Sequence, residues 1–371
     1  MIELIKFELK KIFSNRLIYI AAIGIALFVL SYPVSRYKDI NETFTGREEI
    51  EALAEKYMSD EYTVEEFNEI RKSAMNKFHN KEELNKEDKF LLYYSGSFIK
   101  VNKDIQAEGL EDIESRLEEL KNNNKEDTFE YHNLLKEKEM LSNLDKQESL
   151  YLGDWDMAFD FNVAATMKLT LLVLGLAGIF SSEYTSRVAY INLSTKEGKT
   201  KLNTAKIISA LIYGSLVFIF VSLIYHVGGF ALGLPNGHKP ASYIFSSLYN
   251  ITINEYYIAT LALSYLGTIA FSLLIVLLSL ITKNILVSFG LPLAIYLLPD
   301  MLKLPEAIMK YTYNINFARL LKGKDILGEY ITFDLFGDVV LYPYLIIIVI
   351  AILAIIMLII YNTFSKKQTI A

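Results

Sequence analysis

The sequence of 371 residues contains no cysteine. Disulfide bonds, thiolate nucleophiles, thiolate metal sites and the cysteine-linked anchors of lipoproteins are therefore excluded. Histidine is scarce as well, and His79, His132, His226 and His238 lie far apart and form no H-E-x-x-H pattern. Two histidines at that spacing would be needed to bind zinc on one face of a helix. We therefore predict no metal site.

The chain also lacks the motifs by which enzymes hydrolyse esters or bind nucleotides. It contains no G-x-S-x-G elbow. Gly198, Lys199 and Thr200 resemble the end of a phosphate-binding loop, but such a loop needs a glycine at position 193, which is Leu193, and a preceding strand. We therefore expect no catalytic residue and no cofactor bound by this chain.

What the chain does contain is a mixture that a single soluble domain rarely has. Hydrophobic residues make up 52% and charged residues 22%, and the mean hydropathy is +0.27. Such a composition is expected when apolar and charged residues are segregated into membrane and water-facing parts. Residues 36–156 hold about 18 basic and about 31 acidic residues, so the rest of the chain is basic overall. No soluble basic domain remains to neutralise phosphates, so nucleic acid is not predicted as a partner.

The apolar stretches predict an all-α polytopic membrane protein with six transmembrane helices. They are residues 17–34, 158–182, 207–232, 256–282, 285–298 and 341–364. The loops on one side, together with both ends of the chain and the tail at 365–371, carry about 12 cations against about 4 acids. This asymmetry places both termini in the cytoplasm. A cleaved signal peptide is the alternative for the first stretch, but its apolar core is longer than such peptides carry.

A large insertion of residues 35–157 separates the first two spans and is predicted to be extracellular and α-helical. Thr63 and Glu66 form a capping-box pattern that starts one helix. Leucine stripes on either side of residues 122–124 predict an antiparallel helical hairpin, with a coiled coil as the alternative. The acidic excess attracts cationic solutes over a long range, although the acids could simply keep the domain soluble.

Two further connections are expected on the same outer side, residues 233–255 and 299–340. The second contains Lys303, Glu306 and Lys310, which would be costly at mid-depth in a bilayer. These charges favour a helical hairpin that re-enters the outer leaflet over a full span.

Residues 1–16 are predicted to form an amphipathic helix in the inner membrane interface. Ile5, Leu9 and Ile12 follow helical spacing, while Glu8 and Lys11 are expected mainly on other faces. The alternative is a positively charged flank that only orients the first span.

Two polar side chains fall inside or near the ends of predicted spans. Lys168 is expected to extend its stem outward to the membrane surface, and the alternative is a contact with cargo in the pathway. His226 is expected to be an interfacial histidine, with a proton relay as the alternative.

The loop of residues 183–206 lies between the second and third spans and carries five cations against two acids. Residues 188–193 are apolar enough for a short helix on the membrane or on a partner. The segment resembles the first cytoplasmic loop of ABC-2-type permeases, the type V exporter-like membrane subunits of ABC transporters, and its S-T-K-E-G-K run is similar to a Gram-positive bacterial subgroup. In that family a Glu is followed by a small-residue turn, a leucine-rich stretch, a hydroxyl pair, a basic residue and a Lys.

The residues that match this pattern are Glu183, Leu193, Ser194, Thr195, Lys199 and Lys206. The chain departs from the pattern at Arg187 and Val188, where many members have Gly-Thr, and at Lys196, where others have Pro. The resemblance implies that the matching residues, with Arg187, couple the permease to its ATPase.

The resemblance further implies a permease subunit that hydrolyses nothing itself. ATP and Mg²⁺ would be bound by a separate ATP-binding subunit, and a second permease copy or paralogue would complete the unit in the bacterial cell membrane. It also implies a re-entrant hairpin between the fifth and sixth helices. The apolar pathway favours an amphiphile, peptide or lipid as substrate, including antimicrobial peptides. The alternative is a membrane sensor or scaffold whose outer domain binds a ligand and signals through the loop.

Overall fold

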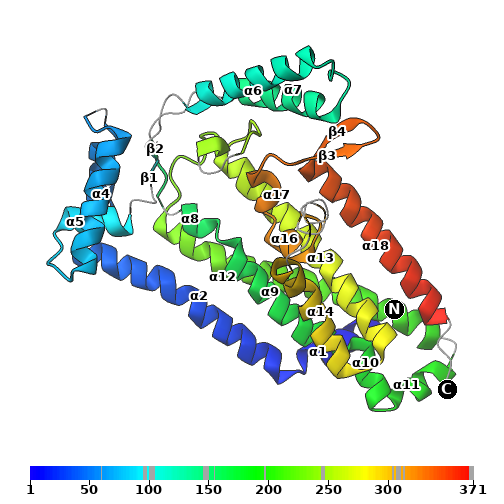
Figure 1. The fold of residues 1–371 in the computed structure, drawn as a ribbon. Helices are drawn as coiled ribbons and strands as arrows, with labels where there is room; N and C mark the ends of the chain where they lie inside the picture. Colours follow the sequence, from blue (N-terminus) through cyan, green and yellow to red (C-terminus); the bar gives the residue numbers. More distant parts are fainter. Residues whose placement is uncertain are drawn as a thin grey trace.

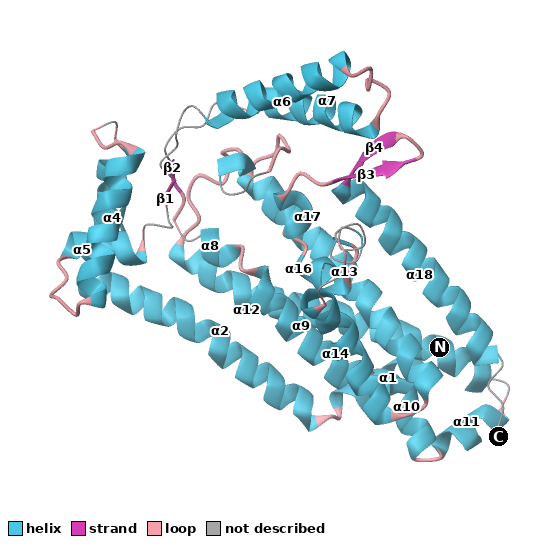
Figure 2. Cartoon of the chain, viewed as in Figure 1, coloured by secondary structure: helices cyan, strands magenta, loops and turns pink. Residues whose placement is uncertain are grey.

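The computed structural model describes all residues of the chain except 60, 95–97, 100–104, 145–149, 154, 196–197, 244–246, 303–304, 306–310, 312–313 and 367–371. Helices dominate, and two small two-stranded sheets complete the fold (Figures 1 and 2).

Among the described residues, five helical segments are long and apolar enough to cross a membrane, and they run side by side in a bundle (Figure 1). They are α2 (Arg16–Thr43), α9 with α10 (Phe161–Leu176 and Gly178–Thr185), α12 (Asn203–Leu232), α13 (Ile253–Thr282) and α18 (Tyr342–Lys366). A sixth apolar helix, α14 (Ile285–Met301), is shorter and contains two prolines. The chain is therefore a mostly helical membrane protein, as its composition predicts.

Helix α13 lies at the centre of this bundle and packs against α12, α14, α16 and α18. It presents small residues to its neighbours, which lets the backbones approach closely. A Cβ at Gly267 would lie 2.3 Å from the carbonyl oxygen of Leu320. Ser264, Thr268 and Ser272 are all buried. By contrast, only 11% of the most apolar 18-residue stretch of α2 is buried within the protein.

The second span is broken at Ala177, between α9 and α10. The backbone N–H groups of Phe180 and Ser181 donate to the hydroxyl oxygen of Ser279 on α13, at 3.1 and 3.0 Å. The same hydroxyl donates to the carbonyl oxygen of Ala177 at 2.7 Å. Backbone groups in an apolar layer need such partners, and Ser279 stabilises the bend by supplying them.

One end of the bundle carries α1 (Ile2–Phe13), α11 (Val188–Ser194), the π-helical turn η2 (Gly198–Leu202) and the last turn of α18 (Figure 1). The corner between α1 and α2 is held by Asn15, whose side chain accepts a hydrogen bond from the Leu17 N–H and donates to the carbonyl oxygen of Leu174 at 3.1 Å. Helix α1 is thereby fixed against α9.

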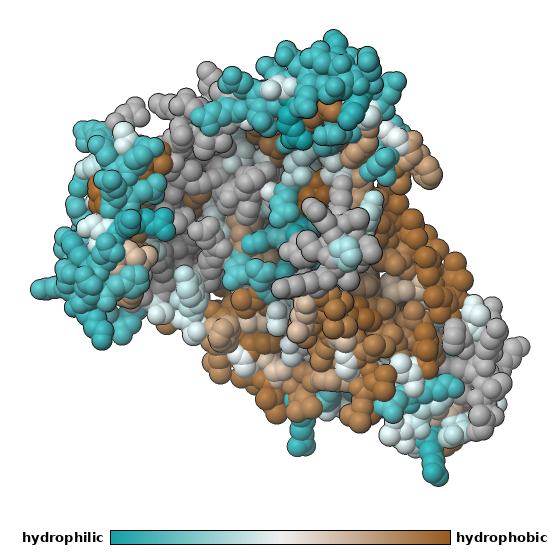
Figure 3. Space-filling view, viewed as in Figure 1, coloured by the Kyte–Doolittle hydropathy of each residue, from teal (hydrophilic) through white to brown (hydrophobic). Residues whose placement is uncertain are grey.

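The opposite end carries the large insertion. It contains α3 (Arg47–Met58), α4 (Val64–His79), α5 (Lys86–Tyr93), β1 (Phe98–Ile99), α6 (Ile105–Asn122), α7 (Phe129–Ser142), β2 (Leu150–Tyr151) and the short α8 (Trp155–Ala158). The capping box of Thr63 and Glu66 is confirmed. The helical hairpin is α6 and α7, packed through Leu117 and Leu134. In Figure 3 these helices form hydrophilic arms above the apolar bundle.

The insertion divides into two units with separate hydrophobic clusters. Helices α3 to α5 pack on Ile40 and Phe44 at the end of α2, because α2 continues without a break through Pro33 to Thr43. The first predicted span, 17–34, is therefore shorter than the helix that contains it. The α6–α7 hairpin has its own cluster and instead contacts β4.

The segment between α14 and α18 contains α16 (Phe317–Lys322), α17 (Asp325–Gly328) and an antiparallel hairpin of β3 (Thr332–Leu335) and β4 (Asp338–Leu341). Helix α16 is buried against α9, α13 and α14. The sequence analysis did not predict the β-hairpin. Lys303, Glu306 and Lys310 lie outside the described residues. The connection between α12 and α13 contains the 3-10 turn η3 (Ala241–Tyr243) among its described residues.

Candidate functional site

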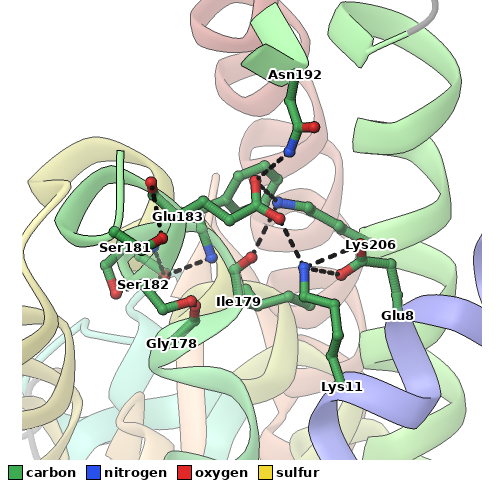
Figure 4. A network of polar contacts seen from close by, with 12 residues as sticks. Glu8, Lys11, Gly178, Ile179, Ser181, Ser182, Glu183, Asn192 and Lys206 are labelled. Atoms are coloured by element: carbon green, nitrogen blue, oxygen red, sulfur yellow. Dashed lines mark hydrogen bonds and ion pairs between the residues drawn. The ribbon is translucent and has the colours of Figure 1, made fainter. Parts of the chain in front are cut away.

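The predicted loop and the N-terminal helix meet in a polar cluster that we call the Glu183 network, made of Glu8, Lys11, Glu183, Asn192 and Lys206 (Figure 4). The Glu183 carboxylate lies near the end of α10. It accepts from the Lys11 ammonium at 2.6 Å and from the Lys206 ammonium at 2.6 Å. Asn192 of α11 donates to it at 3.1 Å. One carboxylate therefore joins four helices, α1, α10, α11 and α12.

Lys206 is the most deeply buried cation of this network, with 1% of its side chain exposed. Besides Glu183, its ammonium donates to the carbonyl oxygen of Ile179 at 3.0 Å and lies 4.4 Å from the centre of the Phe180 ring. Lys206 falls within α12 because the third apolar helix begins at Asn203, four residues before the predicted start.

Helix α1 contributes a second carboxylate that the sequence analysis placed wrongly. Glu8 was expected mainly on a face away from the apolar stripe, but only 1% of it is exposed. Its two oxygens both accept from the Lys11 ammonium at 3.1 Å. Glu8 lies one turn from the buried Ile12, so both face the bundle. The partner that makes burial tolerable is Lys11, which lies between Glu8 and Glu183.

This environment shifts the pKa values of the two residues that α1 contributes to the network, Glu8 and Lys11. Burial raises the pKa of the Glu8 carboxyl above its usual value, although Lys206 and Lys11 act in the opposite direction. Burial alone would lower the pKa of Lys11, but the hydrogen bond and charge of Glu183, and then those of Glu8, outweigh it and raise that pKa. Lys11 therefore stays charged and holds the two carboxylates together.

A cavity of about 570 Å³ opens beside the network, between α1, α10, α11 and η2. Its lining is both apolar and charged. The lining residues are Leu4, Phe7, Glu8, Lys11, Ser182, Glu183, Ser186, Val188, Asn192, Thr195, Gly198 and Leu202. Of the apolar lining residues, Phe7 and Val188 are also exposed at the surface, as is Ile191 on the same helix as Val188. This end of the molecule therefore combines a fixed charge network with uncovered apolar side chains.

The other predicted coupling residues lie around this cavity without joining the network. Arg187 is exposed, and its φ of 61° lies in the left-handed region. Ser194 donates to the carbonyl oxygen of Ile191 at 2.7 Å, and Thr195 accepts from the Gly198 N–H at 3.0 Å. These two hydroxyls end α11 and shape the turn into η2.

Two cations, one acid and one leucine of the loop lie wholly or partly outside the described part of the chain. The side chains of Leu193 and Lys199 lie outside the described part of the chain, as do Lys196 and Glu197 entirely. Glu183 and Lys206 are the predicted coupling residues that the structure brings into direct contact.

The prediction for Lys168 is wrong, because its ammonium does not reach the membrane surface. Only 2% of the residue is exposed. It bonds the hydroxyl of Ser264 and donates to the carbonyl oxygen of Leu321 at 2.7 Å. Leu321 lies in the last turn of α16, where carbonyl groups lack helical partners and attract cations. Lys168 therefore fixes the end of α16 in the bundle.

His226 is likewise buried and does not lie on an exposed interface. Its ring packs 5.0 Å from that of Tyr257 and 5.6 Å from that of Phe161, between centroids. Its Nδ1 atom has no hydrogen-bond partner among the residues that the structure describes. The reason for burial is the aromatic cluster that closes this end of the bundle.

Lys11, Glu8 and Asn192 belong to the site but were not predicted from the sequence. Glu8 and Lys11 could not be assigned to the loop from the sequence, because they lie far from it along the chain: Lys11 and Glu183 are 172 positions apart. A signal was present nevertheless. Ile5, Glu8 and Ile12 share one helical face, and an acid on an apolar face needs a buried cationic partner.

Comparison with protein-family models, with curated proteins and with solved structures finds no match to this chain. The geometry of the site is therefore the basis for its interpretation. Across the described residues no group of three His, Asp or Glu side chains is arranged to hold a metal ion.

Proposed function

We propose that the chain is the membrane-spanning subunit of an ABC exporter, driven by ATP that a separate subunit hydrolyses. The observation that carries this proposal is the Glu183 network, which ties the loop after the second span to the N-terminal helix. Force applied to α11 would reach α1 through Lys11 and α12 through Lys206. The exposed apolar residues around the adjacent cavity offer a partner a surface on which to push.

The backbone at position 187 supports the resemblance to ABC-2-type permeases. Many members have glycine at this place, whereas this chain has Arg187. Its φ of 61° is a conformation that glycine adopts freely and other residues adopt at a cost. The turn between α10 and α11 thus has the shape that the glycine pattern requires.

In this proposal α14 is a sixth span, both termini are cytoplasmic and the insertion carrying α3 to α7 is extracellular. The excess of cations at the end with α1 and α11 supports the orientation. The segment with α16 returns into the bundle as a re-entrant element, and its burial against α9 and α13 supports this.

The working unit would contain two permease chains, identical or paralogous, and ATPase subunits that bind ATP and Mg²⁺. Closure of the ATPases would move α1 and α11 together and switch the pathway between inward-facing and outward-facing states. An amphiphile, a peptide or a lipid-like molecule is the substrate class that suits a largely apolar bundle, and export of antimicrobial peptides or resistance to them is one such role. The bacterial cell membrane is the proposed location.

A sensor or scaffold is the second candidate. It is favoured by a direct contact between the insertion and the segment that leads into α18. Asn133 of α7 accepts hydrogen bonds from the hydroxyls of Tyr330 and Thr332, at 3.0 and 2.6 Å. A ligand that moves α7 would thereby pull on α18.

Purification of the tagged chain from its native membranes distinguishes the two candidates. We expect an ATP-hydrolysing subunit to co-purify in a fixed ratio, and Ile191→Asp on the exposed face of α11 to abolish this. Leu135→Asp, an exposed apolar residue on α7, is the matched control and should retain the subunit. Co-purification without ATPase activity, or equal loss in both variants, would contradict the exporter.

A further inference from the structure

The β3–β4 hairpin ends in a turn whose composition is unusual. Leu335 pairs with Asp338 across a two-residue turn of Phe336 and Gly337, whose φ values are 58° and 93°. Two positive φ values in sequence are typical of the tight hairpin turn in which Asn-Gly is strongly preferred. Asp334 holds the turn by accepting the Gly337 N–H at 2.8 Å.

Phe336 is unfavourable at this place for two independent reasons. A bulky side chain in the left-handed region strains the backbone, and the Phe336 ring is fully exposed in the isolated chain. Leu335 beside it is exposed as well. Strain of this kind persists where surrounding interactions compensate for it, so an observed outlier is grounds for a functional hypothesis.

The position of the hairpin indicates which surroundings compensate for the strain and exposure of Phe336. The hairpin directly precedes α18 and projects sideways off the end of that helix, with β4 packed beside α7 (Figure 1). Along the adjoining side of α18, Tyr344, Ile347 and Ile348 are exposed. This apolar surface continues up to the hairpin (Figure 3). The tip therefore lies at the level where the apolar band of the span ends.

We propose that Leu335 and Phe336 insert into the headgroup boundary of the bilayer beside α18 and act as a membrane anchor. Phe and Leu side chains are the kind that interfacial segments bury at the boundary between headgroups and acyl chains, where removing apolar surface from water is favourable. The anchor also fixes the α6–α7 arm, because Asn133 binds both Tyr330 and Thr332 at the base of the hairpin. The arm is thereby held at a set height above the membrane.

The charges beside the tip define the lipid surface that it fits. Asp334 and Asp338 flank the turn and are exposed, so the anchor favours zwitterionic over anionic headgroups. The same acids disfavour a second copy of the chain as the occupant. A two-fold contact between tips would bring the carboxylates of both copies together, and such like-charge contacts are costly.

Site-directed spin labelling tests the anchor directly, because the chain has no cysteine of its own. The full-length chain would carry one cysteine, by Phe336→Cys, by Asn124→Cys or by Ile352→Cys, and would be reconstituted in phosphatidylcholine vesicles. Asn124 is the water-exposed control, at the α6–α7 turn and also with a positive φ of 54°. Ile352 is the lipid-facing control on α18, with half of its surface exposed.

We expect the label at 336 to collide with oxygen more often, and with a water-soluble nickel chelate less often, than the label at 124. Its values should approach those at 352, and adding phosphatidylglycerol should raise its contact with nickel. A label at 336 that matches the one at 124 would overturn the proposal. Protection from both oxygen and nickel would overturn it too, since it would identify a protein partner or a second copy as the occupant.

Discussion

Replacing Glu183 with glutamine should destabilise the bundle strongly, because it removes the carboxylate that contacts the buried Lys206 ammonium and leaves only the more distant charge of Glu8 from the network. Lys206 keeps its bond to the Ile179 carbonyl oxygen and its contact with the Phe180 ring, but neither carries a full negative charge. Removing one member of a buried ion pair typically costs about 3 to 5 kcal/mol. We expect about 3 kcal/mol, at the low end of that range, because 11% of the Glu183 side chain is exposed.

The other cation of the network should matter less. The Lys11 side chain is 37% exposed, and its loss still leaves Glu183 paired with Lys206. Lys11→Met also removes the ammonium from which both oxygens of the buried Glu8 accept, so Glu8 must take up a proton to stay buried. We therefore expect Lys11→Met to cost more than the roughly 1 kcal/mol of an exposed pair, but less than Glu183→Gln. Replacing Glu183 and Lys206 together by methionine should cost less than Glu183→Gln alone, since no charge then remains unpaired.

The assay is equilibrium unfolding of the purified chain in mixed micelles by titration with dodecyl sulfate. The fluorescence of Trp155 reports the transition, because it is the only tryptophan and is buried in the bundle. An effect of Glu183→Gln no larger than that of Lys11→Met, or a double variant whose cost equals the sum of its singles, would refute the reasoning.

Three further predictions follow from other parts of the molecule. Arg187→Gly should raise the free energy of unfolding by up to about 1 kcal/mol in the same titration, because it relieves the left-handed backbone; Val188→Gly, one residue along in ordinary helix, should lower it, and the reverse order would contradict the geometry. Asn133→Ala should speed amide hydrogen exchange in α7 and in the β3–β4 hairpin by roughly fivefold, because the Thr332 hydroxyl loses a bond of about 1 kcal/mol while Tyr330 still donates to the backbone carbonyl oxygen of residue 133; unchanged exchange would show that the contact does not stabilise either element. Lys86 lowers the pKa of Glu49 to about 2, and Lys56 lowers the pKa of Glu87, from an ordinary value of 4.5. Their contribution to stability is therefore complete above about pH 4.5 and is lost as pH falls toward 2; thermal unfolding of the α3–α5 unit between pH 7 and 3 should show a smaller acid loss in Lys86→Met, and an equal loss would contradict the assignment.

The long spans could be predicted because their signal is local. A run of apolar residues such as 256–282 is sufficient to predict a helix of membrane length, and α13 indeed extends from Ile253 to Thr282. Capping is equally local, as Thr63 and Glu66 show. The β3–β4 hairpin was missed because its turn carries Phe336 where the usual signal is asparagine.

The partners of buried charges could not be predicted, since they come from elsewhere in the chain. Lys168 has a polar end and a long stem, so extending to the surface was the natural expectation. In the structure its ammonium instead bonds the hydroxyl of Ser264 and the carbonyl oxygen of Leu321, which lie 96 and 153 positions away. Glu183 was singled out from its loop, but its contact with Lys11 needed α1 to fold back across the bundle.

The separation of Lys11 from Glu183 by 172 residues also sets an order of events during synthesis at the ribosome. Helix α2 is the first span to emerge and buries little of its surface against later helices, so it can enter the bilayer by itself. Glu8 and Lys11 then wait for the whole insertion and the second span, because Glu183 lies at the end of that span and Lys206 at the start of the third. Closure of the network therefore marks the point at which the nascent chain has completed its second span and begun its third.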